Sequence, residues 1–352
     1  MPTMKAARLF GPRDLRLMEV PLPELRPHDV LCRVVRSGIC GTDYAIYSGQ
    51  SSFAEKGLIR YPMTPGHEWS GTVAEVGPAV EGFRPGDRVV GDTGVSCGIC
   101  EQCLVGRYDL CPEGRAVGTI NAWDGAYAEY IAMPERHLYP LPEAVTFDHG
   151  AMVEPAATAL HAVRRAGVGP GETVLVTGTG PIGIMAAAWA RLSGAAQVLI
   201  AGRKPAKLEL AQALGADVGI NTCDGSLSDA VRRSVGKRGV DRVVEASGSA
   251  ELLLQSLDAV RAGGTVATVA FYEGQFAPLD PDRLVLNGIT LRGVAGSLGM
   301  YRPVLDLMAA GRFDPTPLIT GRYPFEQVLR ALADMEAASE TRVKLMLEMP
   351  PA

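Results

Sequence analysis

Four cysteines in a short stretch constrain this chain more than any other feature. Cys97, Cys100, Cys103 and Cys111 follow the spacing C-x2-C-x2-C-x7-C. Four thiolates complete the tetrahedral coordination of a zinc ion and leave no position open for a substrate. Separate core cysteines or disulfides are the alternative, and the close spacing favours the metal. We therefore predict a structural zinc site in a lobe at about residues 92–113.

Composition narrows the class of protein. The chain has 352 residues, 47% of them hydrophobic, and a formal net charge of −5 without a basic block, which argues against a nucleic-acid or anionic-membrane partner. No apolar run is long enough to span a bilayer, and the start MPTMKAARLF lacks an apolar signal segment. We therefore expect a cytoplasmic protein, in a reducing compartment where thiolates bind metal rather than pair.

The pattern of apolar, glycine and proline residues changes once along the chain and predicts an α/β protein of two domains. The first 150 residues read as short strands separated by Pro and Gly, which is typical of a β-rich, barrel-like domain. From about Thr158, apolar strands alternate with Ala/Leu-rich helices, which predicts a doubly wound parallel sheet. We place the first domain at residues 1–157 and 293–352 and the second at 158–292, and we expect the segments YRPVLDLMAAG and TRVKLMLEM to return to the first.

A second set of metal-binding residue types is spread along the first half. Cys40 lies in GICGTD, His67 and Glu68 in GHE, and Glu154 in EPAAT. A thiolate, an imidazole and one or two carboxylates can hold zinc and leave room for a small ligand. Taken singly, Cys40 reads as a buried strand residue and Glu154 as a helix cap. Their order around the four-cysteine lobe is what favours a catalytic metal site.

Together these motifs carry a family resemblance. GICGTD at 38–43, GHE at 66–68, the four-cysteine lobe, EPAAT at 154–158 and GTGPIG at 178–183 resemble the zinc-dependent medium-chain dehydrogenases of the alcohol dehydrogenase superfamily. The resemblance runs from about Lys5 to Glu348, and Glu154 resembles the sorbitol, sugar-alcohol and threonine dehydrogenase branch. It implies a GroES-like catalytic domain, a Rossmann domain for the dinucleotide, and a homodimer or homotetramer.

The resemblance also implies roles at the catalytic metal. Cys40 and His67 are expected as ligands, Glu154 as a ligand directly or through water, and Glu68 as an alternative ligand that swings in when substrate or water leaves. Thr42 is expected to contact the substrate oxygen.

Two neighbouring positions are less settled. We expect Asp43 to accept a hydrogen bond from the non-ligating nitrogen of His67, with a turn cap as the alternative. Many relatives relay the proton through a histidine five residues after the ligand cysteine, where this chain has Ala45. Tyr44, Tyr47 or a water chain could serve instead, or both tyrosines could be packing residues, so the outer relay stays open.

The cofactor site is predicted from a glycine turn. Gly178, Gly180 and Gly183 form G-x-G-x-x-G, with Pro181 and Ile182 inside it, between the apolar strand VLVTG and an Ala-rich helix. Such glycines let the backbone approach a pyrophosphate at a helix N-terminus. An ordinary glycine turn is the alternative. Further cofactor neighbours are expected at the ends of later strands, at Ser247, Ala270 and Ala295. The resemblance also implies that Arg342 reaches the pyrophosphate, and a surface cation is the alternative.

The end of the next strand addresses the choice between NAD and NADP. A carboxylate about 20 residues after the glycines normally binds the ribose 2′-hydroxyl of NAD. Here the chain reads Ala201-Gly202-Arg203-Lys204, with two cations and no acid. This favours NADP, because cations suit a 2′-phosphate. NAD remains possible if Arg203 and Lys204 are solvated residues that open the following helix.

We therefore predict an enzyme with two zinc ions per chain, one catalytic and one structural, that transfers hydride between a secondary alcohol (polyol, sugar or amino alcohol) and NAD(P). A zinc-free enone or quinone reductase of the same superfamily is one alternative, and a non-enzymatic zinc-binding structural protein is the other. A zinc-free reductase would not need Cys40, His67 and the four-cysteine lobe. A structural zinc protein would not need the catalytic motifs together with the glycine turn.

Overall fold

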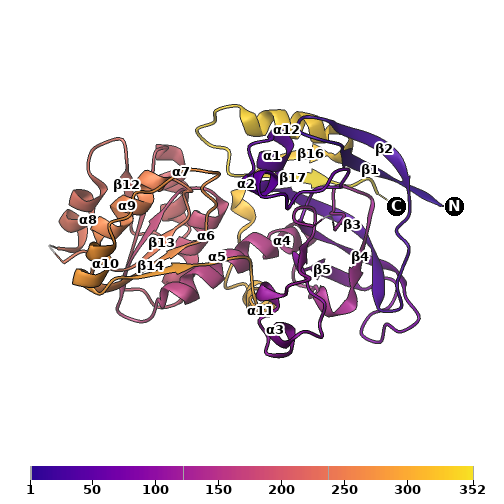
Figure 1. The fold of residues 1–352 in the computed structure, drawn as a ribbon, viewed down its shortest axis with the longest axis horizontal. Coiled ribbons are helices and arrows are strands. Elements are labelled where there is room, and N and C mark those ends of the chain that lie inside the picture. Colours follow the sequence, from indigo (N-terminus) through magenta and orange to yellow (C-terminus); the bar gives the residue numbers. More distant parts are fainter. Residues whose placement is uncertain (1, 122, 237, 352) are drawn as a thin grey trace. The chain divides into compact units, whose positions relative to one another are not determined.

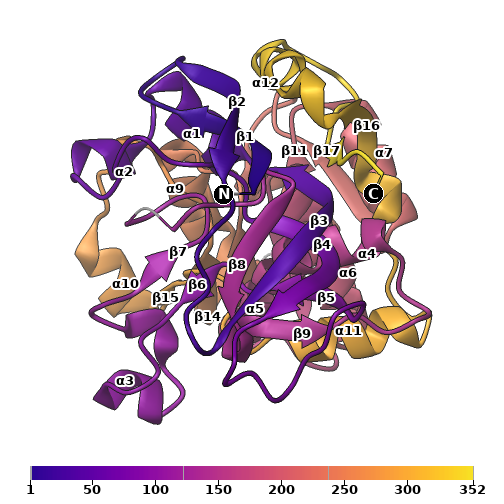
Figure 2. The ribbon, with the colours of Figure 1, turned by 90° about the vertical axis from the view of Figure 1, so that its right-hand side faces the viewer.

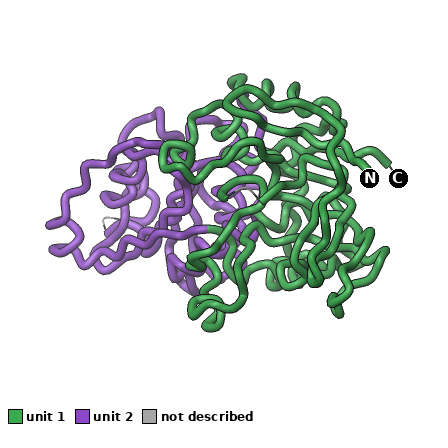
Figure 3. The backbone as a smooth tube through the Cα atoms, turned by 45° about the vertical axis from the view of Figure 1, so that its right-hand side comes forward, with its two compact units in different colours: residues 1–154, 296–338, 344–352 green, residues 155–295, 339–343 purple. Residues whose placement is uncertain are grey.

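The computed structural model describes residues 2–121, 123–236 and 238–351. This described chain divides into two compact units, coloured separately in Figure 3. The first unit comprises Met1–Glu154, Gly296–Ala338 and Lys344–Ala352, and the second comprises Pro155–Ala295 and Ser339–Val343. The chain therefore returns to the first unit at Gly296, and a short stretch, Ser339–Val343, re-enters the second unit before the end.

The first unit is organised around one long strand, β3 (Asp29–Ile39), which pairs with β4, β8 and β17 (Figures 1 and 2). Its sequence DVLCRVVRSGI is rich in β-branched residues and is buried along most of its length. Over the described residues the sheet has seven strands, in the order β16-β17-β3-β4-β5-β9 with β8 beside β3. The other strands are β4 (Glu68–Val76), β5 (Arg88–Gly91), β8 (Tyr130–Pro134), β9 (Leu138–Pro140), β16 (Ile319–Pro324) and β17 (Lys344–Glu348). Within the segment TRVKLMLEM, residues from Lys344 onward supply strand β17 to this sheet, while the preceding residues up to Val343 belong to the second unit.

Smaller elements complete the first unit. β1 (Thr3–Leu9) pairs with β2 (Leu15–Pro21), and β6 (Gly94–Val95) pairs with β7 (Arg115–Ala116), both antiparallel. The helices are α1 (Gly41–Ser48), α2 (Ser52–Glu55), α3 (Glu101–Leu104), α4 (Phe147–Ala151), α11 (Tyr301–Ala309) and α12 (Val328–Glu336). Short 3₁₀ turns lie at η1 (Tyr108–Leu110), η2 (Glu135–His137), η3 (Thr316–Leu318) and η4 (Phe325–Gln327).

The second unit contains the predicted doubly wound sheet. In the described part of the chain it has six parallel strands in the order β12-β11-β10-β13-β14-β15. The strands are β10 (Thr173–Thr177), β11 (Gln197–Gly202), β12 (Val218–Asn221), β13 (Val240–Glu245), β14 (Val260–Thr268) and β15 (Thr290–Gly293). The helices are α5 (Val153–Ala166), α6 (Pro181–Leu192), α7 (Pro205–Ala213), α8 (Leu227–Val235), α9 (Ala250–Ala259) and α10 (Pro281–Asn287). The strand order reverses between β10 and β13, the place where open α/β sheets bind ligands beyond the carboxyl ends of their strands.

Each unit has its own hydrophobic core. That of the first unit includes Trp69, Tyr127 and Phe325, all fully buried. That of the second includes Leu175, Val243 and Val266 from adjacent strands of the parallel sheet. Among the described residues, no helix has the length and apolar character needed to cross a membrane.

Candidate functional site

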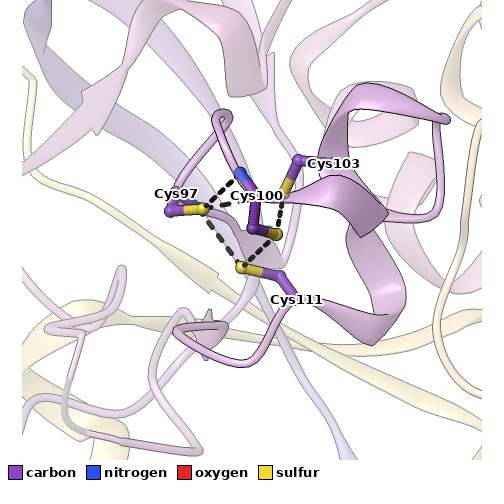
Figure 4. Close-up of side chains that lie close together, drawn as sticks. All are labelled: Cys97, Cys100, Cys103 and Cys111. Carbon is purple, nitrogen blue, oxygen red and sulfur yellow. Dashed lines mark hydrogen bonds between the residues drawn. The ribbon is translucent and has the colours of Figure 1, made fainter.

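The four-cysteine lobe forms the set that the spacing predicts (Figure 4). The four Sγ atoms lie within 4.8 Å of one another, and none is in a disulfide. Individual Sγ–Sγ distances are 3.5 Å for Cys100–Cys103 and 3.9 Å for both Cys97–Cys103 and Cys100–Cys111. A Zn–S bond of ~2.3 Å in a tetrahedron gives an edge of about 3.8 Å. The sulfur atoms are therefore spaced as zinc ligands.

Backbone amides of the lobe favour the thiolate form of Cys97 before any ion is considered. The amide of Cys100 donates to Cys97 Sγ at 3.4 Å, and the amide of Cys97 donates to Cys111 Sγ at 3.5 Å. Hydrogen bonds from the amides of Ile99 and Cys100 lower the pKa of Cys97 to about 6. The thiolate is the form that binds zinc, so these amides prepare the site.

A second cluster unites Cys40, His67 and Glu68, whose ligand atoms also lie within 4.8 Å of one another. Cys40 follows β3 and is the N-cap residue of α1, while Glu68 begins β4. The antiparallel register of β3 and β4 pairs Gly38 with Glu68, which brings the GICGTD and GHE motifs together. Strand pairing therefore assembles ligands that lie 27 positions apart in the sequence.

Glycine at position 38 is required by this arrangement. A Cβ atom at Gly38 would lie 2.2 Å from Glu68 Oε2, well inside contact distance. The glycine of the motif thus leaves the space that the Glu68 carboxylate occupies.

Asp43 holds His67 in one orientation. Its Oδ1 accepts from His67 Nδ1 at 3.1 Å, and its Oδ2 accepts from Tyr127 Oη at 2.9 Å and from the Cys40 amide at 2.9 Å. Burial opposes a charged imidazole, but Asp43 and Cys40 raise the pKa of His67 well above its ordinary value. Because Nδ1 donates to Asp43, Nε2 is the nitrogen that remains for a metal. Asp43 makes both contacts that the sequence suggested, the histidine bond and the turn cap.

Lys344 is the residue of this site that sequence reasoning missed. Its Nζ lies 2.7 Å from Oε1 and 2.6 Å from Oε2 of Glu68 and donates to the Ile39 carbonyl at 3.2 Å. Both side chains of the ion pair are about 2% exposed or less. Burial would lower the pKa of Lys344, but Glu68 and Cys40 raise it. The available signal was a lysine inside the apolar run VKLML, because a buried lysine requires a charged partner.

The remaining predicted catalytic residues, Glu154 and Thr42, are not part of the cluster. Glu154 is buried in the first turn of α5, outside the described three-residue group. Thr42 is half-buried in the first turn of α1. Tyr44 and Tyr47 pack against the core of the first unit, which agrees with the packing alternative.

The glycine turn of the second unit has the shape that a pyrophosphate needs. It follows β10, and Gly180 is the N-cap residue of α6, with Pro181 at the first helical position. A Cβ at Gly183 would lie 2.0 Å from the Gly178 carbonyl oxygen, so the fold itself requires glycine there. Gly180 is different, because a Cβ there would meet no described protein atom within 4 Å. Open space at the helix N-terminus is what an approaching anion requires.

Cations gather where β11 meets α7. Arg203 is exposed after the strand, and Lys204 is the N-cap residue of the helix and is paired with Glu340. Burial and the neighbouring cations Arg342, Lys204 and Arg203 lower the pKa of Lys207. Arg342 therefore lies within electrostatic range of this group.

The other predicted cofactor neighbours lie at the ends of later strands. Ser247, Ala270 and Ala295 follow β13, β14 and β15 at the carboxyl edge of the sheet.

Comparison with known proteins agrees with this geometry. The alcohol dehydrogenase GroES-like domain matches residues 26–143, and the zinc-binding dehydrogenase family matches residues 181–310. Sorbitol dehydrogenase of Bacillus subtilis (strain 168) is 32% identical over 94% of this chain and 92% of its own length. L-Threonine 3-dehydrogenase of Streptomyces avermitilis is 37% identical over 95% of this chain and 96% of its own.

Solved structures share the whole fold. A zinc-binding dehydrogenase from Sinorhizobium meliloti 1021 bound to NADP has a TM-score of 0.91 and 33% identity, covering 99% of this chain and 100% of that one. An alcohol dehydrogenase from Escherichia coli CFT073 complexed with NADH has a TM-score of 0.91 and 26% identity, covering 98% and 99%.

The chain belongs to the zinc-binding medium-chain dehydrogenases of the alcohol dehydrogenase superfamily, close to the sorbitol and threonine dehydrogenases. It is an NAD(P)-dependent oxidoreductase that acts on CH–OH donors. The four-cysteine set is its structural zinc site, and the cluster of Cys40, His67 and Glu68 marks its catalytic zinc site.

Proposed function

We propose that the chain oxidises a secondary alcohol of the polyol, sugar or amino-alcohol class to the corresponding ketone, with NADP as the preferred acceptor. In the balanced reaction the carbinol carbon would give a hydride to the nicotinamide, and the hydroxyl would give a proton to solvent. Zinc supplies a Lewis acid for the substrate oxygen, and the nicotinamide supplies the hydride acceptor. The relatives named sorbitol and threonine dehydrogenase support this substrate class.

The buried pair of Glu68 and Lys344 is the observation that carries the catalytic part of the proposal. With both of its oxygens held by Lys344 Nζ, Glu68 would bring little net charge to a bound metal. Cys40 and Glu154 would then be the anionic ligands beside neutral His67, which makes a neutral zinc site. A site of that charge stabilises a developing alkoxide better than an anionic one. We accordingly assign Glu68 a position off the metal during chemistry.

Other residues of the first unit would orient His67 and transfer the substrate proton. Asp43 holds the His67 ring, so that one nitrogen faces Cys40 and Glu68. Thr42, two residues after the ligand cysteine, would accept the proton from the substrate hydroxyl. Because Ala45 stands where many relatives carry a histidine, we propose that this proton is released to solvent through water.

A substrate panel tests the reaction. Zinc-loaded protein is assayed with polyols, sugars, amino alcohols and ethanol, and reduced nicotinamide is followed by its absorbance. We expect the highest kcat/KM with a secondary alcohol that has a polar neighbour on the next carbon. Cys40→Ser should abolish turnover in a folded protein. Turnover of primary alcohols alone, or activity that persists in Cys40→Ser, would contradict the proposal.

The NADP preference rests on the cations beside β11. Relatives hold either NADP or NADH, so the shared fold does not choose between them. Arg203, Lys204, Lys207 and Arg342 form a positive group beside the end of β11, where Glu340 pairs with Lys204 and the strand itself ends without a carboxylate. We take this group to be the site of the ribose 2′ substituent. A 2′-phosphate would gain charge-assisted hydrogen bonds there.

Cofactor kinetics test this part separately. The ratio of kcat/KM for NADP over NAD should exceed one and should fall about tenfold in Arg203→Ala, since one charged hydrogen bond is of that size. Arg233→Ala, on the exposed face of α8, is the matched control and should leave the ratio unchanged. A clear NAD preference of the unmodified protein would refute the assignment.

A further inference from the structure

Glu245, the last residue of β13, is a buried carboxylate with an unusual set of partners. It is 0% exposed, yet its described hydrogen-bond partners include no cationic side chain. Its Oε1 accepts from the Ser247 amide at 2.8 Å and from the Ser247 hydroxyl, and its Oε2 accepts from the Tyr272 hydroxyl. Thr268 Oγ1 and Thr177 Oγ1 are further donors, at 3.4 and 3.5 Å. Burying a carboxylate costs free energy even when it is hydrogen-bonded, so an apolar residue would have served the core better.

The donors share one location in the sheet. Thr177 is the last residue of β10 and Thr268 the last of β14, and these strands flank β13. Tyr272 follows β14 by four residues, and its hydroxyl also lies 2.6 Å from Thr268 Oγ1. The carboxylate of Glu245 therefore ties together the carboxyl ends of three adjacent parallel strands. It does so beside the reversal of strand order, where ligands of such sheets bind.

The same network reaches the glycine turn. The Ala246 amide donates to the Thr177 carbonyl at 2.9 Å. A Cβ at Gly178 would lie 2.7 Å from the Ala246 carbonyl oxygen and 2.8 Å from the Ser247 nitrogen. The peptide after Glu245 thus lies directly against the first glycine of the turn. Any shift of Ser247 would move the surface on which that turn packs.

Downstream, Glu245 orders the start of a helix. Ser247 Oγ accepts from the Ser249 amide at 3.1 Å, and Ser249 caps α9 by accepting from the Leu252 amide at 3.3 Å. With its hydroxyl proton given to Glu245, Ser247 Oγ is left as an acceptor for Ser249. One carboxylate consequently sets the rotamers and backbone of the segment from Ala246 to Ser249.

We propose that Glu245 is a positioning residue for the nicotinamide half of the dinucleotide. This inference rests on the proposed location of that half beside Ser247 and Ala270. Glu245 does not touch the cofactor. Its carboxylate holds the ends of β13 and β14, so that the backbone after each strand presents a preformed wall to the nicotinamide ring. We place the adenosine half at the end of β11, which β10 separates from β13, so we expect its binding to depend much less on this network.

Replacement of Glu245 by glutamine separates the two halves. Glutamine keeps the shape but turns one acceptor oxygen into an NH₂ donor, which opposes the hydroxyl donors of either Ser247 or Tyr272. NADPH reports on the nicotinamide through its fluorescence, and adenosine 2′,5′-bisphosphate reports on the adenosine half alone. We expect Glu245→Gln to bind NADPH about tenfold more weakly, since one hydrogen bond to a charged group is of this size. Its bound fluorescence should shift toward that of free NADPH, while affinity for the bisphosphate stays within about twofold.

Two further variants keep the test decisive if Glu245→Gln folds poorly. Tyr272→Phe removes one donor and leaves the carboxylate, so the same selective loss should appear in smaller size. Tyr323→Phe removes a comparable tyrosine–carboxylate bond, to Asp334 in the first unit, and should change neither ligand. Zinc content and thermal unfolding are measured for each variant.

The outcomes are distinguishable. Unchanged NADPH affinity and fluorescence in both Glu245→Gln and Tyr272→Phe would overturn the inference. An equal loss of affinity for both ligands would also overturn it, because the role would then be structural for the whole sheet.

If the unmodified, zinc-loaded protein binds the bisphosphate but shows no nicotinamide fluorescence change, the proposed location of the nicotinamide fails, and the inference fails with it. If NADH binds more tightly than NADPH, NADH and adenosine monophosphate replace the two probes, and only the NADP preference is refuted.

Discussion

Lys344 Nζ lies 2.6 and 2.7 Å from the two carboxylate oxygens of Glu68, and the pair is almost completely buried. Because Lys344 neutralises Glu68, this carboxylate can lie beside the catalytic zinc site without adding a full negative charge to it. It also ties β17, near the end of the chain, to the GHE motif at the start of β4.

Lys344→Met should therefore free Glu68 from its partner. Breaking a buried ion pair by removing one member costs about 3–5 kcal/mol, because the other charge is left unpaired. We expect that loss in the free energy of unfolding, together with a lower kcat, as Glu68 turns to the metal. Urea unfolding and the absorption spectrum of the cobalt-substituted enzyme measure the two effects. The double variant Lys344→Met/Glu68→Gln should recover most of the stability. A double variant no more stable than Lys344→Met would show that the pair is not the cause.

Asp43→Asn tests the orientation of His67. Loss of a carboxylate behind a metal-bound histidine weakens metal affinity by about 10- to 100-fold. Competition with a chelator should show this loss at the catalytic site, while zinc in the four-cysteine lobe is retained. Tyr127→Phe, which removes only a donor to Asp43, is the matched control and should weaken zinc far less. Equal zinc affinity in Asp43→Asn and the unmodified protein would refute the orienting role.

Cys103→Ser separates the structural zinc from the catalytic one. The lobe between Cys97 and Cys111 has only short helical turns, so its fold depends on the metal. We expect one zinc fewer per chain and a lower unfolding temperature. Cys40→Ser should also lose one zinc but unfold close to the temperature of the unmodified protein. If the two variants lost stability equally, the division into a structural and a catalytic site would not hold.

Gly38→Ala should disturb the catalytic site by steric overlap alone. The added Cβ would lie 2.2 Å from Glu68 Oε2 and would force the carboxylate off Lys344. Overpacking of this kind costs about 1–3 kcal/mol, which urea unfolding can measure. Gly169→Ala is the control, because a Cβ there meets no described atom within 4 Å. Stability equal to that of the control would mean that the site tolerates the methyl group.

Asp92 should make stability depend on pH. Burial raises its pKa from 3.8 to about 6, although Gly94, Tyr108 and Ser297 donate hydrogen bonds to it. A raised native pKa stabilises the fold at low pH, and this contribution is lost as pH rises through about 6. Between about pH 5 and pH 7.5 the loss from this one group is about 1 kcal/mol. The unfolding free energy of the unmodified protein minus that of Asp92→Asn should fall by this amount. A difference that stays constant over this range would contradict the shifted pKa.

Local motifs could be interpreted from sequence because their members are joined by short stretches of chain. The four cysteines lie within 15 residues, and the glycine turn within six, so the sequence restricts each to a few geometries. The order of the GICGTD and GHE motifs likewise predicted two halves of one site. The apolar strands alternating with helices predicted the parallel sheet for the same reason, since each strand and helix pattern is local.

Only the tertiary structure decided which distant side chains meet. Lys344 and Glu68 are 276 positions apart, and their contact depends on β17 pairing with β3 in one particular register. Glu245 gathers its donors from three strands whose order in the sheet no local pattern specifies. Buried charges need partners, but a sequence does not name the partner. Strand order and register determine which side chains meet. The packing of the whole core sets that order and register, and the sequence neighbours of each residue do not.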